Sequence, residues 1–366
     1  MPANRFLLAG FLSFALAACS DAAAPDAAKA PEVDAAWSRG VPEVTLMTQN
    51  LYIGTDVDAV LLALMTPDPN DDLDALLTAI ATLERTDFPT RAAELARIIR
   101  NTRPHAVGLQ EVSIVEIVLP PFGLNVQIDF LPILLEALAD KGLEYEVAAQ
   151  VLNIDAQPAP GVRQVDYDVL LVDAERVKVN SAAGHTFGKN VGPFAPGVTL
   201  IRGWVEANVT IGNRTFTVVS THPEPDLGTA SFAELRALQV GEITDSVADE
   251  VPVVIMGDLN DVRGSPMYRT LRGEGFTDVW RALRPDLPGL TCCHAPDLSD
   301  AVPTFTERID YIFTRGFDRG RRDVAGDVRR VGINPSRRPE GPLGEIWISD
   351  HAGLLATLRL PPRGGQ

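Results

Sequence analysis

Strand-like segments dominate this chain and follow one another in runs, and this order limits the architecture more than any other feature. Alternating or continuously apolar stretches of strand length outnumber the stretches with helical periodicity. Such runs favour packed sheets flanked by helices over a parallel doubly wound sheet, which needs regular strand–helix alternation. The predicted strands cover residues 43–49, 106–110, 145–152, 167–172, 203–211, 214–220, 251–256, 309–313 and 353–358.

Helical periodicity is confined to a few stretches between these strands. One helix is predicted to open at Phe88-Pro89-Thr90-Arg91, because Pro is tolerated in the first turn. Helices are also predicted over residues 131–139 and 232–247, and the acidic stretch 66–74 is predicted to be a loop. The apolar stripe of the first helix consists of Ala92, Leu95, Ala96 and Ile99.

The first forty residues are predicted to lie outside the folded domain. Arg5 precedes an apolar run over residues 6–18, which is too short to span a bilayer and ends in small residues, as secretory signals do. The following segment is rich in Ala, Pro and Asp without periodicity, which predicts a disordered tether. We expect the folded domain over residues 41–362.

Leu16-Ala17-Ala18-Cys19 resembles the lipobox of bacterial lipoproteins. The resemblance implies cleavage before Cys19 and lipidation of its thiol, so that residues 1–18 form the signal peptide and residues 19–40 the tether. The alternative is a plain secretory signal with an incidental cysteine. Because Ser20 rather than Asp follows the cysteine, the resemblance implies an exported lipoprotein of the outer membrane, facing the periplasm or the cell surface.

Two adjacent cysteines, Cys292 and Cys293, are the ones that remain beside Cys19. In an oxidising compartment they can close a small vicinal ring. His294 stands next to them, but two thiolates and an imidazole within three residues do not easily surround one ion. We therefore expect a loop element here, oxidised or reduced, and no metal site.

The net charge of −17 and the pI of about 4.7 bear on the partners of the chain. An acidic protein repels polyanions, which disfavours tight and extended nucleic-acid binding. Bound cations reverse the sign of the field locally, so a metal-dependent nuclease stays open.

Short polar clusters at the ends of the predicted strands carry the chemistry. Any one of them could be a turn or a helix cap. Together, their carboxylate and amide oxygens suit a hard cation such as Mg²⁺ or Mn²⁺. The clusters are Thr48-Gln49-Asn50, Leu109-Gln110-Glu111, Ser220-Thr221-His222, Gly257-Asp258-Leu259-Asn260, Arg308-Ile309-Asp310-Tyr311 and Ser349-Asp350-His351.

In this order the six clusters resemble the motifs of the endonuclease/exonuclease/phosphatase superfamily. That group includes deoxyribonuclease I, exonuclease III, neutral sphingomyelinases and inositol-polyphosphate 5-phosphatases. The resemblance extends over residues 43–360. It implies a deoxyribonuclease I-like fold, a four-layer α/β sandwich of two mixed sheets flanked by helices.

The resemblance also implies a metal site. Glu111 would be the principal ligand, with Asn50 beside it, and Asp350 would contribute to the site. One or two Mg²⁺ or Mn²⁺ ions are the expected cofactors.

Five further residues take catalytic roles from the resemblance. Asp258 and Asn260 would orient the attacking water and stabilise the charged transition state. His351, oriented by Asp310, would be a general base or an electrophilic contact to the phosphate. His222 matches a position that contacts the phosphate or acts as an acid.

The sequence therefore predicts a divalent-metal-dependent phosphoesterase outside the cytoplasm, acting on a phosphodiester rather than a monoester. The substrate stays open among a phospholipid head group, a nucleotide or nucleic acid, and a small phosphoester. The alternatives are a nuclease and, in another class, a catalytically inactive binding protein tethered to the surface. The expected partners are this substrate and, through the lipid anchor, a membrane, and we expect a monomer.

Lipidation of Cys19 can be tested by substitution of this residue. Cys19→Ser removes the thiol that would carry the lipid, so the protein should move from the membrane fraction into the soluble fraction. Fractionation followed by immunoblotting measures this shift, with Ser20→Ala as a control that keeps the thiol. Unchanged membrane association of Cys19→Ser would argue against the anchor.

Overall fold

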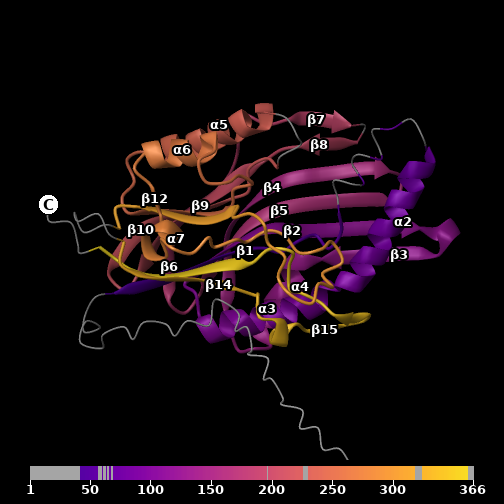
Figure 1. The fold of residues 1–366 in the computed structure, drawn as a ribbon, viewed down its shortest axis with the longest axis horizontal. Helices are drawn as coiled ribbons and strands as arrows, with labels where there is room; N and C mark the ends of the chain where they lie inside the picture. The colour runs from indigo at the N-terminus through magenta and orange to yellow at the C-terminus, as the bar shows by residue number, and fades with distance from the viewer. Residues whose placement is uncertain are drawn as a thin grey trace, which may run out of the picture. The chain divides into compact units, whose positions relative to one another are not determined.

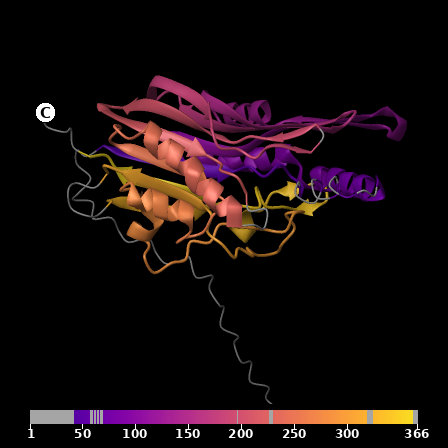
Figure 2. The same ribbon diagram turned by 90° about the horizontal axis from the view of Figure 1, so that it is seen from above.

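Two mixed β-sheets pack face to face in the computed structural model of this chain, and helices cover the outer face of each sheet (Figures 1 and 2). The structure describes residues 42–56, 60, 63, 66, 69–195, 197–225, 230–317 and 324–361. The predicted signal peptide, the tether and Cys19 lie outside these residues. The predicted four-layer α/β sandwich is confirmed.

The first sheet combines parallel and antiparallel pairs. β1 and β2 run parallel, whereas β17 and β5, their outer neighbours, run antiparallel to them. β3 (Leu124–Asp129) pairs with the distal half of β2. The other strands, in pairing order, are β14 (Gly326–Val331), β17 (Gly353–Arg359), β1 (Glu43–Asn50), β2 (Ala106–Leu119), β5 (Val162–Asp173), β4 (Tyr145–Ala159), β8 (Val198–Leu200) and β7 (Gly192–Ala195).

The second sheet repeats this mixture, with a parallel pair at its centre. β10 and β11 run parallel, and β9 and β13 flank them in antiparallel orientation. Gly212-Asn213 joins β9 to β10, so the predicted hairpin is confirmed. In pairing order the strands are β12 (Thr277–Asp278), β13 (Asp310–Arg315), β11 (Val253–Asp258), β10 (Arg214–Thr221), β9 (Gly203–Ile211) and β6 (Val177–Thr186), and β15 (Glu340–Gly341) and β16 (Gly344–Glu345) form a separate hairpin.

The helices divide between the two outer faces. α3 (Phe88–Thr102) and α4 (Phe130–Ala139) pack on the first sheet, and α5 (Ala230–Ser246) and α6 (Pro266–Gly273) pack on the second, as Figure 1 shows. Among the described residues no helix is long and apolar enough to cross a membrane. The remaining helices are α2 (Pro69–Thr86), α7 (Val279–Leu283) and the 3₁₀ turns Pro120–Phe122 and Pro335–Arg337.

Branched apolar side chains fill the space between the two sheets. Leu46 and Val172 of the first sheet meet Val218 and Val254 of the second, and each is fully buried. Close packing of such residues excludes water from the sheet interface. The sheets therefore hold a rigid frame for the loops and strand ends at their edge.

Several elements differ from the prediction: β4 and β5 extend beyond the predicted strands 145–152 and 167–172, and β3, β6, β7, β8 and β14 were not predicted. The strand predicted over residues 106–110 continues to Leu119. Glu111 within it adopts a left-handed φ of 55°, and the pairing register with β5 shifts there. This irregularity breaks the alternation by which the strand is recognised in the sequence. The acidic stretch 66–74 is also not entirely a loop, because α2 begins at Pro69, where Pro is tolerated in a first turn.

Arg91 of α3 ties the ends of two distant segments together. Its guanidinium, 1% exposed, donates to the carbonyl oxygens of Leu51, Tyr52, Thr86 and Ile348. Leu51 follows the last residue of β1, and Ile348 directly precedes the cluster Ser349-Asp350-His351. One buried side chain therefore clamps the two segments that carry predicted site residues.

Arg91→Met should lower the free energy of unfolding by roughly 3 kcal/mol or more, because several buried carbonyl groups lose their donor and each costs about 1–3 kcal/mol. Chemical denaturation measures the change. Arg97→Met on the same helix is the matched control, since the side chain of Arg97 is 33% exposed and pairs with Glu94, and its loss should cost less than about 1 kcal/mol. Equal losses in the two variants would contradict a clamping role for Arg91.

Candidate active site

Parallel pairing in each sheet brings two polar strand ends to one edge. In the first sheet Asn50 lies beside Gln110, and in the second Thr221 lies beside Gly257. His222 directly after β10 and Asp258 at the end of β11 therefore lie at the same edge, and Glu111 lies at the irregularity of β2.

A close approach of the two sheets joins these edges. A Cβ atom on Gly108 would lie 2.4 Å from the Ser220 hydroxyl oxygen, so only glycine fits between the sheets here. Two residues further along β2, the Gln110 side-chain amide donates to the Ser220 hydroxyl at 3.0 Å. The polar ends of the two sheets are thus held in direct contact.

Glu111 is held by donors from β1 and the loop after it. Asn50 Nδ2 donates to Glu111 Oε1 at 2.9 Å, and the backbone N–H of Ile53 donates to Oε2 at 2.9 Å. The left-handed backbone of Glu111 turns its side chain out of the strand alternation. Non-glycine residues in this conformation are strained and cluster at functional sites.

Asp258 stands at the centre of the arrangement. Its Oδ2 accepts from Asn50 Nδ2 at 3.1 Å, and its Oδ1 accepts from the backbone N–H of Asn260 at 2.9 Å. The Asn260 side chain donates to Pro223 O. The pKa of Asp258 is raised to about 7, mainly by burial, while the His351 charge lowers it and the nearby Asp310 carboxylate raises it.

His351 and Asp310 form a buried imidazole–carboxylate pair. His351 Nδ1 lies 2.8 Å from Asp310 Oδ2, and Asp310 is fully buried. The other ring nitrogen, Nε2, lies 3.7 Å from Asp258 Oδ2 and 4.0 Å from Asp350 Oδ1. Burial alone lowers the pKa of His351, but Asp310, Asp350 and Asp258 outweigh it and raise that pKa well above its usual value.

His222 has the opposite electrostatic setting. Its Nε2 lies 3.6 Å from Asp258 Oδ2, while Arg202 Nη1 lies 3.2 Å from its Nδ1. Burial lowers the pKa of His222 well below its usual value, and the Arg202 and His351 charges lower it further. The pocket therefore holds one imidazole that favours the protonated form and one that favours the neutral form.

Residues that the sequence reading missed complete the site around His222. Arg202 is 6% exposed and lies 3.8 Å from Glu224 Oε1, and both residues line the pocket. Asp166 also lines the pocket and Asp168 is fully buried, and the pKa of Asp166 is raised to about 7, mainly by burial. Two carboxylates two residues apart at the start of the predicted strand 167–172 were the available signal, because unpaired buried charges are costly.

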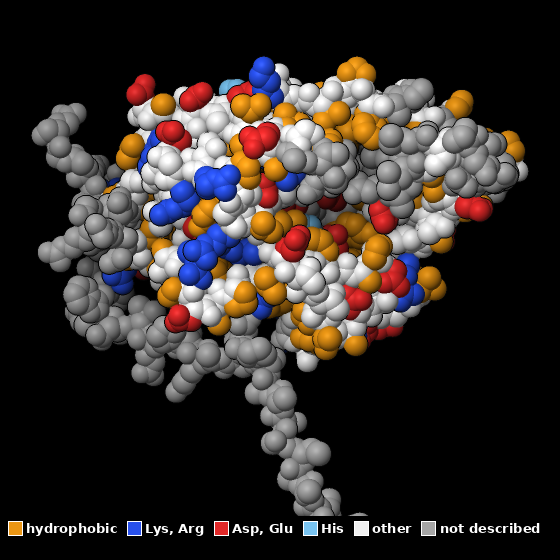
Figure 3. All heavy atoms as spheres, turned by 45° about the horizontal axis from the view of Figure 1, so that its top comes forward, with side chains coloured by type: hydrophobic (Ala, Val, Ile, Leu, Met, Phe, Trp, Pro, Cys, Tyr) orange, Lys and Arg blue, Asp and Glu red, His pale blue; other side chains and the backbone are white. Residues whose placement is uncertain are grey.

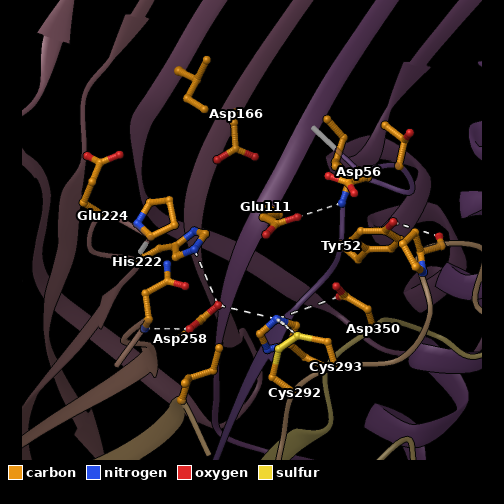
Figure 4. A pocket seen from close by; sticks show the side chains of 18 of the residues that line it. Tyr52, Asp56, Glu111, Asp166, His222, Glu224, Asp258, Cys292, Cys293 and Asp350 are labelled. Atoms are coloured by element: carbon orange, nitrogen blue, oxygen red, sulfur yellow. Dashed lines mark hydrogen bonds and ion pairs between the residues drawn. A yellow bond between two sulfur atoms is a disulfide. The ribbon is translucent and has the colours of Figure 1, made fainter. Parts of the chain in front are cut away.

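These side chains surround a pocket of about 340 Å³ (Figures 3 and 4). Glu111, Asp258 and Asp350 point into the same opening in Figure 4. Of the predicted site residues, Asn50 and Asp310 lie behind the wall and support residues that line it. Those that line the pocket are Glu111, His222, Asp258, Asn260, Asp350 and His351.

The donor set fits a hard divalent cation. The pKa of Asp350 is raised to about 6, mainly by burial, with His351 lowering it and Glu111 raising it, so the charged carboxylate is disfavoured here unless a cation compensates it. Glu111 and Asp350, with Asp258, offer oxygen ligands of the kind that Mg²⁺ and Mn²⁺ prefer. Asn50 presents its amide nitrogen to Glu111 and Asp258, and its Oδ1 accepts from Tyr52 N at 2.8 Å.

A tighter group of potential ligands consists of Asp258, Asp310 and His351, whose ligand atoms lie within 4.8 Å of one another. We favour the site around Glu111, because Asp310 is fully buried and already engaged with His351.

Comparison with known proteins agrees with this geometry. Residues 82–351 match the model of the Endonuclease/Exonuclease/phosphatase family. No curated protein sequence matches the chain.

Three solved structures illustrate the similarity of fold. An endonuclease/exonuclease/phosphatase from Beutenbergia cavernae aligns with a TM-score of 0.56 at 20% identity, over 87% of this chain and 72% of its own. One from Bacteroides vulgatus aligns with a TM-score of 0.51 at 18% identity, over 87% and 99%. D. rerio TDP2 complexed with a single strand DNA product aligns with a TM-score of 0.50 at 16% identity, over 87% and 99%.

The effect of Asp310 on the pKa of His351 can be tested without a substrate. Asp310→Asn removes the closest charge that raises the pKa of His351, so in metal-free protein this pKa should fall by about 1–3 units. Histidine NMR titration measures it. Asp300→Asn is the matched control, because Asp300 faces His294 at 3.1 Å and should leave His351 unchanged. A His351 pKa that is the same in Asp310→Asn and the unmodified protein would refute the pairing.

Proposed function

The chain belongs to the endonuclease/exonuclease/phosphatase family, and on this basis we propose that it is a divalent-metal-dependent hydrolase of phosphodiesters. The observation that carries the proposal is the convergence of Glu111, Asp258 and Asp350 with the His351–Asp310 pair on one pocket. Carboxylate oxygens for a cation beside a positioned imidazole are the parts that phosphoryl transfer to water requires.

Glu111 and Asp350 would hold Mg²⁺ or Mn²⁺, which when bound supplies Lewis acidity and neutralises charge on the phosphoryl oxygens. Asn50 fixes Glu111 and Asp258 in position through its amide nitrogen. The backbone N–H of Asn260 holds Asp258 from the other side.

The chain's own residues divide the proton chemistry. Asp258, which Asn50 and the backbone N–H of Asn260 hold in place, accepts the proton of the attacking water as the water oxygen bonds to phosphorus. Protonated His351, whose Nε2 faces the pocket, donates a hydrogen bond to a phosphoryl oxygen while the P–O bond to the leaving group breaks, and the leaving oxygen takes a proton from solvent. Arg202 and neutral His222 lie on the Asp258 side of the pocket, where they contact the substrate phosphate.

Charge favours a diester over a monoester. Six carboxyl groups and one arginine, Arg202, are among the described residues that line the pocket. A phosphodiester brings one negative charge, whereas a monoester brings close to two, so the monoester is repelled more strongly.

Nucleic acid is the alternative substrate. Figure 3 shows Lys and Arg side chains gathered to one side of the hollow, where they could guide a phosphate backbone. D. rerio TDP2 has been solved with a single strand DNA product. Against this stands the net charge of −17, which lowers the affinity for polyanions.

The place of action is proposed from the N-terminus. The apolar run before Cys19 and the lipobox-like Leu16-Ala17-Ala18-Cys19 support an exported lipoprotein held at the outer membrane. Phospholipid head groups would then be within reach of the domain, which acts as a monomer.

The test is a substrate panel with Mg²⁺ or Mn²⁺ and with EDTA. It contains bis(p-nitrophenyl) phosphate, p-nitrophenyl phosphate, phosphatidylcholine and sphingomyelin vesicles, and single- and double-stranded DNA. We expect diester hydrolysis that exceeds monoester hydrolysis, vanishes with EDTA and returns with added metal. Full activity in metal-stripped protein would overturn the mechanism, and no turnover on any substrate would favour the inactive binding protein.

Glu111→Gln sharpens this test. Loss of the carboxylate should lower kcat/KM by about 10² or more, the scale of a positioned catalytic group, and should weaken metal binding while the fold is retained. Glu116→Gln is the matched control, because Glu116 lies on the same strand but pairs with Arg163 at the surface. Equal activity of the two variants would remove Glu111 from the site.

A further inference from the structure

The pair Cys292 and Cys293 lies in the wall of the catalytic pocket, where the structure forms a disulfide between them (Figure 4). The segment runs between the two parts of the imidazole–carboxylate pair. Cys292 exchanges backbone hydrogen bonds with Glu307, three residues before Asp310, and His294 N donates to Asp350 O at 2.9 Å. The backbone therefore holds both sulfurs at a defined place in the wall.

One sulfur contacts the ring atom that faces the pocket. Cys293 Sγ lies 3.9 Å from His351 Nε2, while Nδ1 of the same ring is engaged with Asp310. The ligand atoms of Cys292, Cys293 and His351 lie within 4.8 Å of one another. Two sulfurs and one imidazole nitrogen thus converge on one point.

The sequence suggested a different imidazole, and this explains why no metal site was expected. His294 follows the cysteines directly, but its Nδ1 lies 3.1 Å from Asp300 Oδ2 and its ring stacks on Trp347 at 4.3 Å between centroids. These two contacts fix the His294 ring toward Asp300 and Trp347. The nitrogen that faces them comes from His351, 58 residues along the chain.

The chemistry of this group depends on the oxidation state of sulfur. A disulfide offers no thiolate, whereas two thiolates with an imidazole form a ligand set typical of Zn²⁺. Soft sulfur selects Zn²⁺ over Mg²⁺, while the oxygen ligands around Glu111 and Asp350 select the hard cation. His351 Nε2 faces both sets of ligands, with Asp350 Oδ1 at 4.0 Å and Cys293 Sγ at 3.9 Å.

We propose that Cys292, Cys293 and His351 form a redox-controlled binding site for a thiophilic divalent cation such as Zn²⁺. When the site is filled, it withdraws His351 Nε2 from the catalytic pocket and stops turnover. The binding of the cation is independent of the function proposed above, whereas the loss of turnover rests on it.

Reduction of the disulfide and binding of the cation each conserve atoms and electrons. A dithiol reductant gives two electrons and two protons, so the S–S bond breaks, two thiols form and the reductant becomes a disulfide. On binding, two sulfur–cation bonds form and both thiols release their protons to solvent. Nε2 binds through its lone pair, after loss of its proton where the ring is charged.

The experiment uses the full chain carrying Cys19→Ser, so that Cys292 and Cys293 are the cysteines present. One portion stays oxidised, and the other is reduced with a phosphine, which carries no thiol, and is then desalted. Thiol titration should give no free thiol in the first portion and two in the second. Two free thiols in the oxidised portion would overturn the proposal.

Zn²⁺ binding is then measured by equilibrium dialysis in excess Mg²⁺, which occupies the oxygen ligands. The reduced portion should bind one Zn²⁺ more than the oxidised portion. With Co²⁺ as the probe, only the reduced portion should show sulfur-to-metal charge-transfer absorption. Equal zinc stoichiometry, or no such absorption, would overturn the site.

Variants assign the ligands. The double variant Cys292→Ser/Cys293→Ser should lose the redox-dependent zinc, and His351→Gln should weaken it by at least about 10- to 100-fold, the scale seen when even an outer-shell partner is lost. His294→Gln is the matched control and should keep the zinc, because His294 faces Asp300. An equal loss in His294→Gln and His351→Gln would contradict the assignment.

Measurements of diester hydrolysis distinguish the zinc site from the proposed hydrolase activity. Zn²⁺ should inhibit diester hydrolysis only after reduction. Equal inhibition of both portions overturns the switch while the hydrolase stands. Redox-dependent zinc binding in a protein that hydrolyses no phosphoester supports the site and overturns the hydrolase.

Discussion

The confinement of several carboxylates in one buried pocket is the constraint on which the site depends. Burial and mutual repulsion raise the pKa values of Asp258, Asp166 and Asp350. Such a cluster persists only when donors and positive charges offset the repulsion. Asn50, the Asn260 N–H, protonated His351 and Arg202 provide part of this compensation, and the proposed divalent cation provides the rest.

The frame that holds these charges together is built from residues that do no chemistry. Gly108 allows the two sheets to touch, and Gln110 bonds Ser220 across them. Arg91 binds the carbonyl groups that follow β1 and precede the Asp350 segment. Rigid support of this kind holds catalytic groups within the small tolerances that phosphoryl transfer demands.

The same pocket joins two kinds of donor. Oxygen ligands from Glu111 and Asp350 suit a hard cation, and the sulfurs of Cys292 and Cys293 suit a soft one. His351 faces both through Nε2. The proposed hydrolase would therefore respond to the redox state of its surroundings through a residue it needs for turnover.

Much of the fold could be predicted from local patterns. The hairpin at Gly212-Asn213, the helix that opens near Phe88 and the buried strand before Asp258 agree with the prediction, because each depends on neighbours in the chain. The true length of β2 was missed, because the left-handed Glu111 breaks its alternation.

The sequence by itself determined the strand-rich architecture and, through the ordered polar clusters, the residues that meet at the pocket. Only the tertiary structure decided that Arg202, Asp166 and Asp168 surround His222, and that His351 rather than His294 faces the two sulfurs. Periodicity reports which face of an element is buried, but these contacts join residues tens of positions apart. They arise from strand pairing and the close approach of two sheets, which no local pattern contains.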